Sequence, residues 1–191
     1  MGRVGAHDGG NKVSRPAVRP TGVERTFGAD EVIVTKTDRG GRMTYVNDVF
    51  CRVSAHPERE MLGQPHNMIR HPDMPRAVFK LLWETIDAGR EIFALVLNLA
   101  GDGAHYWVLA HVTPTRDASG AVVGYHSNRR VPSRAAVAAA DGLYRELRAV
   151  EARHQGANEA AEAGYQALMA RLQEAGQTYD EFVWSLIETG N

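Results

Sequence analysis

Hydrophobic and polar residues alternate in short stretches between residues 31 and 130, which predicts a domain rich in β-strands. β-branched residues dominate 31–37, and residues 42–46 form a return strand after the glycine-containing turn at 38–41. Three more strands are predicted, with Gly- and Asp-containing turns between them, at 91–99, 104–114 and 122–130. Loops this short imply antiparallel neighbours.

Helical patterns lie between the second and third predicted strands. Asn47 and Asp48 are both good N-cap residues for a short apolar helix. Apolar residues three and four positions apart predict a longer helix over 76–88. Between these helices, residues 63–75 contain three prolines together with His, Arg, Asp and Asn side chains. Because each proline removes a backbone N–H and restrains its predecessor, we expect fixed turns with polar side chains here, suited to a polar ligand.

The sequence becomes rich in Ala, Glu and Arg after about residue 135. We predict one amphipathic helix over 135–173 and a short helix over 180–188. Gly156 and Gly164 are expected to weaken the long helix by about 1 kcal/mol each relative to Ala. Its apolar stripes exceed what a small sheet domain needs, which predicts a homodimer through this segment. The stripe residues are Leu143, Leu147, Val150, Tyr165, Leu168 and Leu172.

Composition indicates three segments: a flexible leader over 1–27, a folded domain over 28–132 and a helical segment for signalling or dimerisation over 133–191. The leader is rich in Gly and Pro and has few large apolar residues. A chain of 191 residues allows one domain of ordinary size with extensions.

The net charge of −1 argues against a general nucleic-acid or membrane-surface binder. Cys51 is the one cysteine, which excludes an internal disulfide or a zinc–cysteine cluster and fits a reducing compartment. No apolar run is long enough to span a bilayer, and the N-terminus does not look like a secretory signal. We therefore expect a cytoplasmic protein.

No catalytic or metal-binding set is predicted. His71 and Asp73 are separated by Pro72, which restricts their geometry, and a third ligand is lacking. Cys51 lies in an apolar helical stretch, where a free cysteine packs as a small hydrophobe. We therefore expect a protein that is not an enzyme, and a flavin-dependent enzyme ranks last among the alternatives.

Three stretches closely resemble the sensory PAS domain of bacterial aerotaxis receptors: residues 45–50 (YVNDVF), 63–75 (GQPHNMIRHPDMP) and 103–108 (GAHYWV). The resemblance covers residues 31–131. It implies an α+β PAS fold over 28–132, a five-stranded antiparallel sheet with short helices on one face, followed here by the amphipathic helical extension.

The resemblance also implies that the domain binds FAD non-covalently and that the flavin's redox state reports respiratory electron flow. Transferred by position, the cofactor-binding residues are Asn47, Arg70, His71, Asp73 and Asn98. The predicted set also includes Phe79, as an apolar wall for the flat ring, and Trp107. Arg70 offers a forked cation for the pyrophosphate, and Asn47 or Asn98 offers an amide for the polar edge of the flavin. Alanine at Arg70 or Asp73 is expected to lower cofactor occupancy.

Two positions depart from the family pattern. Ile92 and Phe93 stand near the place of a usual tryptophan, and Leu99 and Ala100 replace basic residues after the strand asparagine. The second change removes positive charge that we expect beside the phosphates.

Two alternatives to FAD remain open at this point. A haem-binding, gas-sensing PAS domain would use one axial histidine, and the candidates are His66, His71, His105 and His111, with His66 the best placed. A cofactor-free PAS domain would serve protein association alone. A light-sensing domain of the LOV type would place its reactive cysteine near His66, so a cysteinyl-flavin photocycle is not expected. In each case the predicted partners are a second copy and a downstream chemotaxis or other signalling protein.

Overall fold

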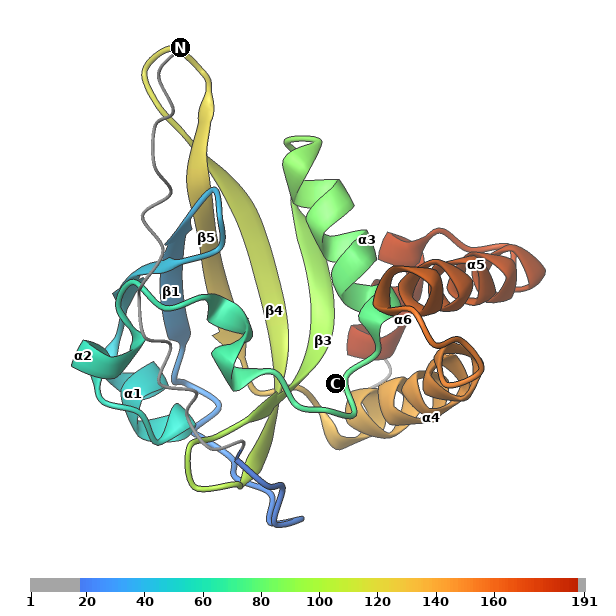
Figure 1. Ribbon diagram of the computed structural model, residues 1–191, viewed down its shortest axis with the longest axis horizontal. Coiled ribbons are helices and arrows are strands. Elements are labelled where there is room, and N and C mark those ends of the chain that lie inside the picture. Colours follow the sequence, from blue (N-terminus) through green and yellow to red (C-terminus); the bar gives the residue numbers. More distant parts are fainter. Residues whose placement is uncertain (1–17, 189–191) are drawn as a thin grey trace, which may run out of the picture.

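A five-stranded antiparallel sheet forms the centre of the computed structural model, which describes residues 18–188 (Figure 1). The strands are β1 (Ile33–Asp38), β2 (Met43–Val46), β3 (Ile92–Leu99), β4 (His105–Arg116) and β5 (Val122–Arg130). Their order across the sheet is β2-β1-β5-β4-β3. The predicted fold class and all five predicted strands are confirmed.

The β1–β2 turn forms as its glycines predict. Gly41 has a φ of 74°, which a residue with a Cβ rarely adopts. The Asp38 carboxylate accepts a hydrogen bond from the Arg42 backbone N–H at 2.9 Å, which holds the turn closed. The turn therefore pairs β1 with β2, and β5 pairs with the other edge of β1.

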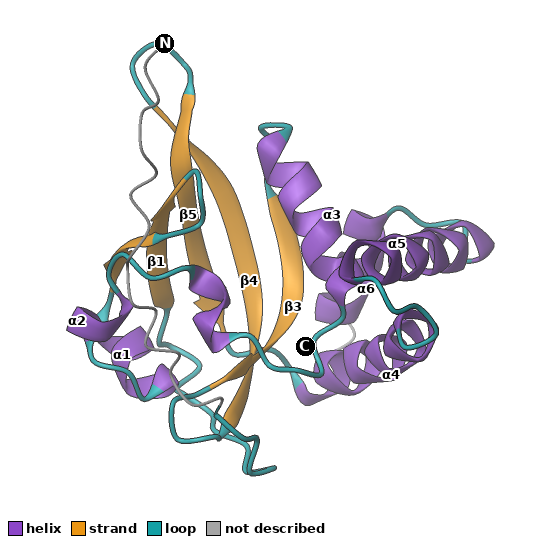
Figure 2. Ribbon diagram, in the orientation of Figure 1, coloured by secondary structure: helices purple, strands orange, loops and turns teal. Residues whose placement is uncertain are grey.

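Helices between β2 and β3 cover one face of the sheet (Figure 2). They are α1 (Asp48–Ser54), α2 (Glu58–Met61), the 3-10 helix η1 (His66–Ile69) and α3 (Arg76–Asp87). We call this face the cavity face; β3 turns Val96 and Asn98 toward it. Because side chains alternate along a strand, Leu95 and Leu97 lie on the opposite side, which we call the outer face.

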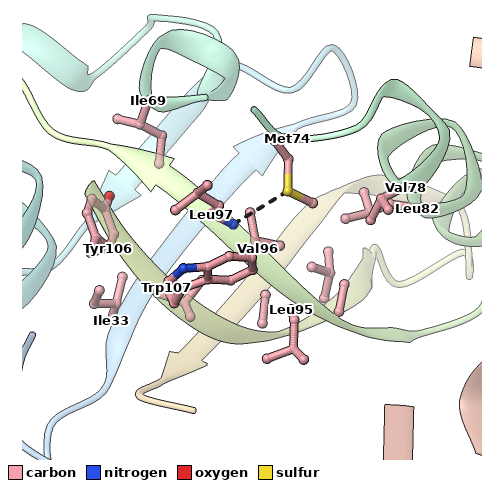
Figure 3. Packing of buried hydrophobic residues seen from close by; sticks show 14 of the residues in the cluster. Ile33, Ile69, Met74, Val78, Leu82, Leu95, Val96, Leu97, Tyr106 and Trp107 are labelled. Atoms are coloured by element: carbon pink, nitrogen blue, oxygen red, sulfur yellow. Dashed lines mark hydrogen bonds between the residues drawn. The ribbon is translucent and has the colours of Figure 1, made fainter. Parts of the chain in front are cut away.

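The proline-rich stretch runs along the free edge of β3. Arg70 forms an isolated antiparallel bridge with Asn98, and the sulfur of Met74 accepts the backbone N–H of Leu97 at 3.5 Å (Figure 3). Covering an edge strand in this way removes an exposed row of backbone groups. The stretch is thus fixed to the strand that carries Asn98.

The C-terminal segment forms three helices, so the prediction of a single helix over 135–173 is wrong. Helix α4 spans Arg134–Glu151, α5 spans Ala157–Glu174 and α6 spans Tyr179–Glu188. The chain reverses at residues 152–156, where Gly156 occupies the N-cap position of α5. Helices α4 and α6 contact β3, whereas α5 lies along α3 (Figure 1). The α4–α5 hairpin therefore wraps around the β3 side of the sheet.

A buried carboxylate joins this hairpin to α3. Glu151 accepts hydrogen bonds from the backbone N–H groups of Arg76 at 3.0 Å and Ala77 at 2.8 Å. These are unpaired donors of the first turn of α3, whose N-cap residue, Pro75, provides no side-chain acceptor. Glu151 thus caps a helix that lies far from it in the sequence.

Much of the apolar stripe that predicted a dimer packs inside one chain. Leu147, Leu168 and Leu172 are buried, and Tyr165 lies near the Lys80 ammonium on α3. The stripe therefore has intramolecular partners, and the homodimer stays a prediction.

Substituting Gly164 with alanine should destabilise the protein by about 1–3 kcal/mol, although alanine favours a helix. A Cβ at Gly164 would lie 2.7 Å from the Glu151 carboxylate and 3.1 Å from the Ala77 Cβ. Gly142 on α4 is the matched control, because a Cβ there meets nothing within 4 Å. Urea unfolding should show Gly142→Ala more stable than the parent by up to about 1 kcal/mol and Gly164→Ala less stable. A gain at both positions would contradict the close packing of α3 and α5.

The predicted flexible leader is corrected for its last residues. Arg25 N–H donates to the His105 carbonyl at 2.7 Å, His105 N–H donates to the Val23 carbonyl at 2.9 Å, and Phe27 is buried. These contacts fasten the segment to the start of β4. Residues 1–17 of the predicted leader lie outside the described residues. In the part of the chain that is described, no helix is long and apolar enough to cross a membrane.

Candidate functional site

A cavity of about 350 Å³ lies between the cavity face of the sheet, η1, α3 and the start of α5. This volume is within the range of small-molecule sites. Its apolar wall comes from strands and from α3: Phe79, Leu82, Trp83, Ile86, Val96, Ala110 and Val112. Helix α5 contributes Ala157, Asn158 and Ala161. The sheet, the helices that cover it and the C-terminal hairpin therefore all contribute to one site.

The charge of the cavity wall is entirely positive among the described residues. Arg70, Arg76, Lys80 and Arg129 line it, and no carboxylate does. Lys80 is paired with Glu84 and Glu162, which stand outside the wall. Burial lowers the pKa of Arg70, and the positive charge of Arg76 lowers it further. Cations grouped without carboxylates favour an anionic ligand.

Three residues of the predicted binding set line the cavity together: Arg70, Phe79 and Asn98. The Arg70 guanidinium stacks 4.3 Å from the centre of the Phe79 ring and donates to the Met74 carbonyl at 3.0 Å. Asn98 is 3% exposed, and its side chain makes no hydrogen bond to another described residue. The cavity thus offers a cation and a free amide from two bridged backbone positions, and a flat ring from α3.

Asn47 lies outside the cavity wall because its side chain is used elsewhere. Its Oδ1 accepts the N–H groups of Val34 at 3.0 Å and Phe50 at 3.1 Å, and its Nδ2 donates to the Val32 carbonyl at 2.8 Å. The amide therefore caps α1 and ties it to β1. The prediction of an N-cap is confirmed, and the three hydrogen bonds of this amide go to backbone groups instead of into the cavity.

His71 and Asp73 also lie outside the wall. Arg70 has extended backbone angles, so the neighbouring side chains point to opposite sides of the chain. His71 is buried beside the ring of His105, with its Nδ1 accepting the Asp73 N–H at 3.1 Å. The Asp73 carboxylate is largely exposed and lies 3.4 Å from Arg148 on α4. These two residues support the loop and the hairpin instead.

Trp107 is on the wrong face of the sheet for the cavity. It pairs with Leu97 across β3 and β4, so both side chains point to the outer face. There its ring stacks on Tyr144 of α4, with ring centres 5.9 Å apart. Trp107 therefore joins the sheet to the C-terminal helices.

The residues that depart from the family pattern do not remove the positive charge of the cavity wall. Ile92, Phe93, Leu99 and Ala100 all lie outside its wall. Arg76 and Lys80, from the first half of α3, provide cations in addition to Arg70.

Sequence reasoning missed the contribution of β5. Tyr125, Ser127 and Arg129 alternate along this strand and all line the cavity. Period-two alternation in residues 122–130 is the signal that places them on one face, but an arginine at a strand end is ordinarily taken as solvated. The residues of α5 carried no signal, because a polar helix start does not reveal which element it will contact.

His66 lines the cavity, and its Nε2 lies 2.7 Å from the Arg129 guanidinium. Burial lowers the pKa of His66 to about 3, and the charge of Arg129 contributes to the shift. Of the other haem candidates, His71, His105 and His111 stand outside the wall. A histidine whose free nitrogen accepts from an arginine is not available to iron, so the haem alternative loses its best ligand.

The low pKa of His66 predicts acid sensitivity. Between its ordinary pKa of 6.5 and about 3, the unfolded chain takes up a proton that the folded chain does not. His66 therefore leaves the free energy of unfolding unchanged above pH 6.5. Below pH 6.5 it lowers that free energy by up to about 1.4 kcal/mol for each pH unit. We expect the parent to lose about 2–3 kcal/mol more than His66→Gln between pH 7 and 4.5 in urea unfolding. Equal losses would contradict a neutral His66 in the folded protein.

Residues 31–127, half of the chain, match the family model described as the PAS fold. With the strand order and helices above, this shows that the chain belongs to the PAS family. The predicted resemblance to aerotaxis receptors is confirmed too, since the chain is 40% identical over 121 residues to the aerotaxis receptor of Escherichia coli (strain K12).

That match covers 63% of this chain and 24% of the receptor, so the chain corresponds to about a quarter of the relative's length. The nitrogen fixation regulatory protein of Klebsiella pneumoniae is 26% identical over 99 residues, which are 52% of this chain and 20% of that protein. The dark structure of the blue-light photoreceptor Aureochrome1 LOV superposes with a TM-score of 0.50 at 24% identity, covering 62% of this chain and 86% of that one. This last likeness concerns the fold alone.

Proposed function

We propose that the cavity binds FAD and that the domain is a redox sensor of the aerotaxis or energy-taxis type. The observation that carries the proposal is the wall with four cations and no carboxylate, since FAD is a flat ring system joined to a pyrophosphate. The similarity to an aerotaxis receptor supports the same assignment.

The residues present suit such a ligand. Arg70, Arg76 and Lys80 would bind the phosphates, because a guanidinium can form paired charge-assisted hydrogen bonds. The Asn98 amide would meet a polar edge of the ring, which carries donors and acceptors. Val96 and Ala110 on the sheet and Phe79 on α3 give the ring apolar walls that exclude water. When bound, flavin supplies a group that takes up and releases electrons.

The signal would leave through the C-terminal helices. Helix α5 contributes to the cavity wall and is fixed to α3 through the Lys80–Glu162 ion pair of 3.2 Å. Glu151, at the end of α4, fixes the other helix of the hairpin to α3. A ligand that fits differently in two redox states therefore changes how firmly α5 docks. A cytoplasmic location, a homodimer and a downstream chemotaxis or other signalling partner belong to this proposal, as does the absence of enzymatic turnover.

An absorption spectrum of the purified protein, followed by mass spectrometry of the heat-released ligand, tests the proposal. We expect a yellow protein that releases FAD. Ala110→Phe fills the ring slot from the sheet side and should be colourless, whereas Ala118→Phe, in the exposed β4–β5 turn, should stay yellow. A parent that stays colourless after incubation with FAD would contradict the proposal and favour association alone. Steady consumption of an electron donor would instead indicate an enzyme.

A further inference from the structure

A buried cation without a counterion forms part of the cavity wall on β5. Arg129 is 5% exposed; its Nη2 donates to Thr35 Oγ1 at 3.0 Å and lies 2.7 Å from His66 Nε2. Its Nη1 is buried and has no hydrogen-bond partner among residues 18–188, and no carboxylate in that range forms an ion pair with it. Burial lowers the pKa of Arg129 to about 10, so the group keeps its charge at neutral pH.

A second unpaired group lies beside it. Ser127 is two residues earlier on the same face of β5, and its Oγ is also buried without a partner among the described residues. Thr35 is directly opposite Ser127 on β1, so the three side chains form one polar patch in the cavity wall. A buried polar group without a partner costs about 1–3 kcal/mol, and a charged one costs more. Two such groups at one place indicate that a ligand supplies the acceptor.

This patch is separate from the cations proposed to bind phosphates. Arg70 contacts Met74 and Phe79, whereas Arg129 contacts Thr35, His66 and the ring of Phe50, so the two guanidinium groups share no partner. The polar patch therefore serves a different part of the ligand. An apolar end of the ring would leave Arg129 without a hydrogen-bond acceptor. An end with carbonyl oxygens provides acceptors for both the Arg129 guanidinium and the Ser127 hydroxyl.

We propose that Ser127 and Arg129 bind the dicarbonyl edge of the flavin ring, and that Arg129 favours the ring's reduced, negatively charged form over its neutral oxidised form. This inference rests on the proposed function. Two electrons and one proton convert the neutral ring into one that carries a single negative charge. A nearby buried cation stabilises that added charge strongly, because little water screens it. Arg129 is thus a residue that sets the reduction potential.

Reductive titration with dithionite against reference dyes tests this role. Dithionite supplies the two electrons and becomes sulfite, and water supplies the proton. In Arg129→Gln, the affinity for reduced flavin should fall at least tenfold more than the affinity for oxidised flavin, which makes the midpoint potential about 30 mV more negative for a two-electron couple. Arg129→Lys keeps the charge and should shift the potential less. Arg130→Gln is the matched control, since Arg130 is exposed and points to the outer face.

Ser127→Asp gives an independent measurement if Arg129→Gln does not fold. It leaves Arg129 in place and adds a carboxylate next to it, so the potential should again become more negative. A parent that binds no flavin would overturn both the proposed function and this inference. A parent that binds flavin, with variants at both positions that match its potential, would overturn this inference alone.

Discussion

Replacing Arg70 with methionine should weaken FAD binding by roughly 30-fold to several thousand-fold while the domain stays folded. Removing one member of a buried charge pair typically costs about 2–5 kcal/mol, and each 1.4 kcal/mol is about a factor of ten. Methionine keeps much of the packing on the Phe79 ring, which lies 4.3 Å from the guanidinium, so the charge is the main loss. Besides this packing, the Arg70 side chain contributes one hydrogen bond to the fold, to the Met74 carbonyl.

Fluorescence titration with FAD, together with circular dichroism, measures this effect. Arg90→Met is the matched control, because Arg90 is exposed beyond the end of α3 and stands outside the cavity wall. The variant Asp73→Ala distinguishes the prediction from the family pattern from the prediction from the structure. The position of Asp73 in the family motif predicts that this variant lowers FAD occupancy. The Asp73 carboxylate is exposed and lies outside the cavity wall, which predicts little change in FAD occupancy. Unchanged affinity in Arg70→Met would contradict the site.

Replacing Glu151 with alanine should release the α4–α5 hairpin and lower the free energy of unfolding by about 3 kcal/mol. The carboxylate is the acceptor for two backbone N–H groups at the start of α3, and hydrogen bonds to a charged group contribute about 1.5–3 kcal/mol each. Glu151 is 9% exposed, so water does not readily replace it. Because α5 forms part of the cavity wall, FAD should also dissociate faster.

Hydrogen exchange of α5, with and without FAD, distinguishes release of the hairpin from general unfolding. We expect fast exchange in α5 of Glu151→Ala while β4 and β5 stay protected, and slower exchange when FAD is added. Glu146→Ala is the control, since Glu146 is exposed on the same helix. Protection in α5 equal to that of the parent would show that Glu151 does not hold the hairpin.

Local chemistry was sufficient to predict most of the domain. The glycines at 40–41 fixed the first hairpin, Asn47 marked the start of α1, and apolar spacing marked α3. The C-terminal segment was harder to predict, because a glycine such as Gly164 can either weaken a helix or allow close packing. In an isolated helix it is a weak point, whereas in this fold it allows α5 to approach Glu151 and Ala77. Only the tertiary contact decides between them.

The binding site was predictable in part for a similar reason. Arg70 and Asn98 are neighbours through a bridge between the proline-rich stretch and β3, which sequence position alone matched correctly. Trp107 failed because a motif does not state the face of a strand, and its pairing with Leu97 places it on the outer side. Arg129 was missed because an arginine at a strand end is ordinarily taken as solvated, as its exposed neighbour Arg130 is, although strand alternation places the two on opposite faces.

The strand order also determines when the cavity is completed during synthesis. β1 pairs with β2, which follows it immediately, and with β5, which leaves the ribosome much later. Closing so long a stretch of chain costs entropy, so the centre of the sheet forms only after β5 has emerged. Helix α5 emerges later still and adds the last side of the wall. A ligand can therefore enter a nascent chain whose sheet is finished and whose pocket is still open.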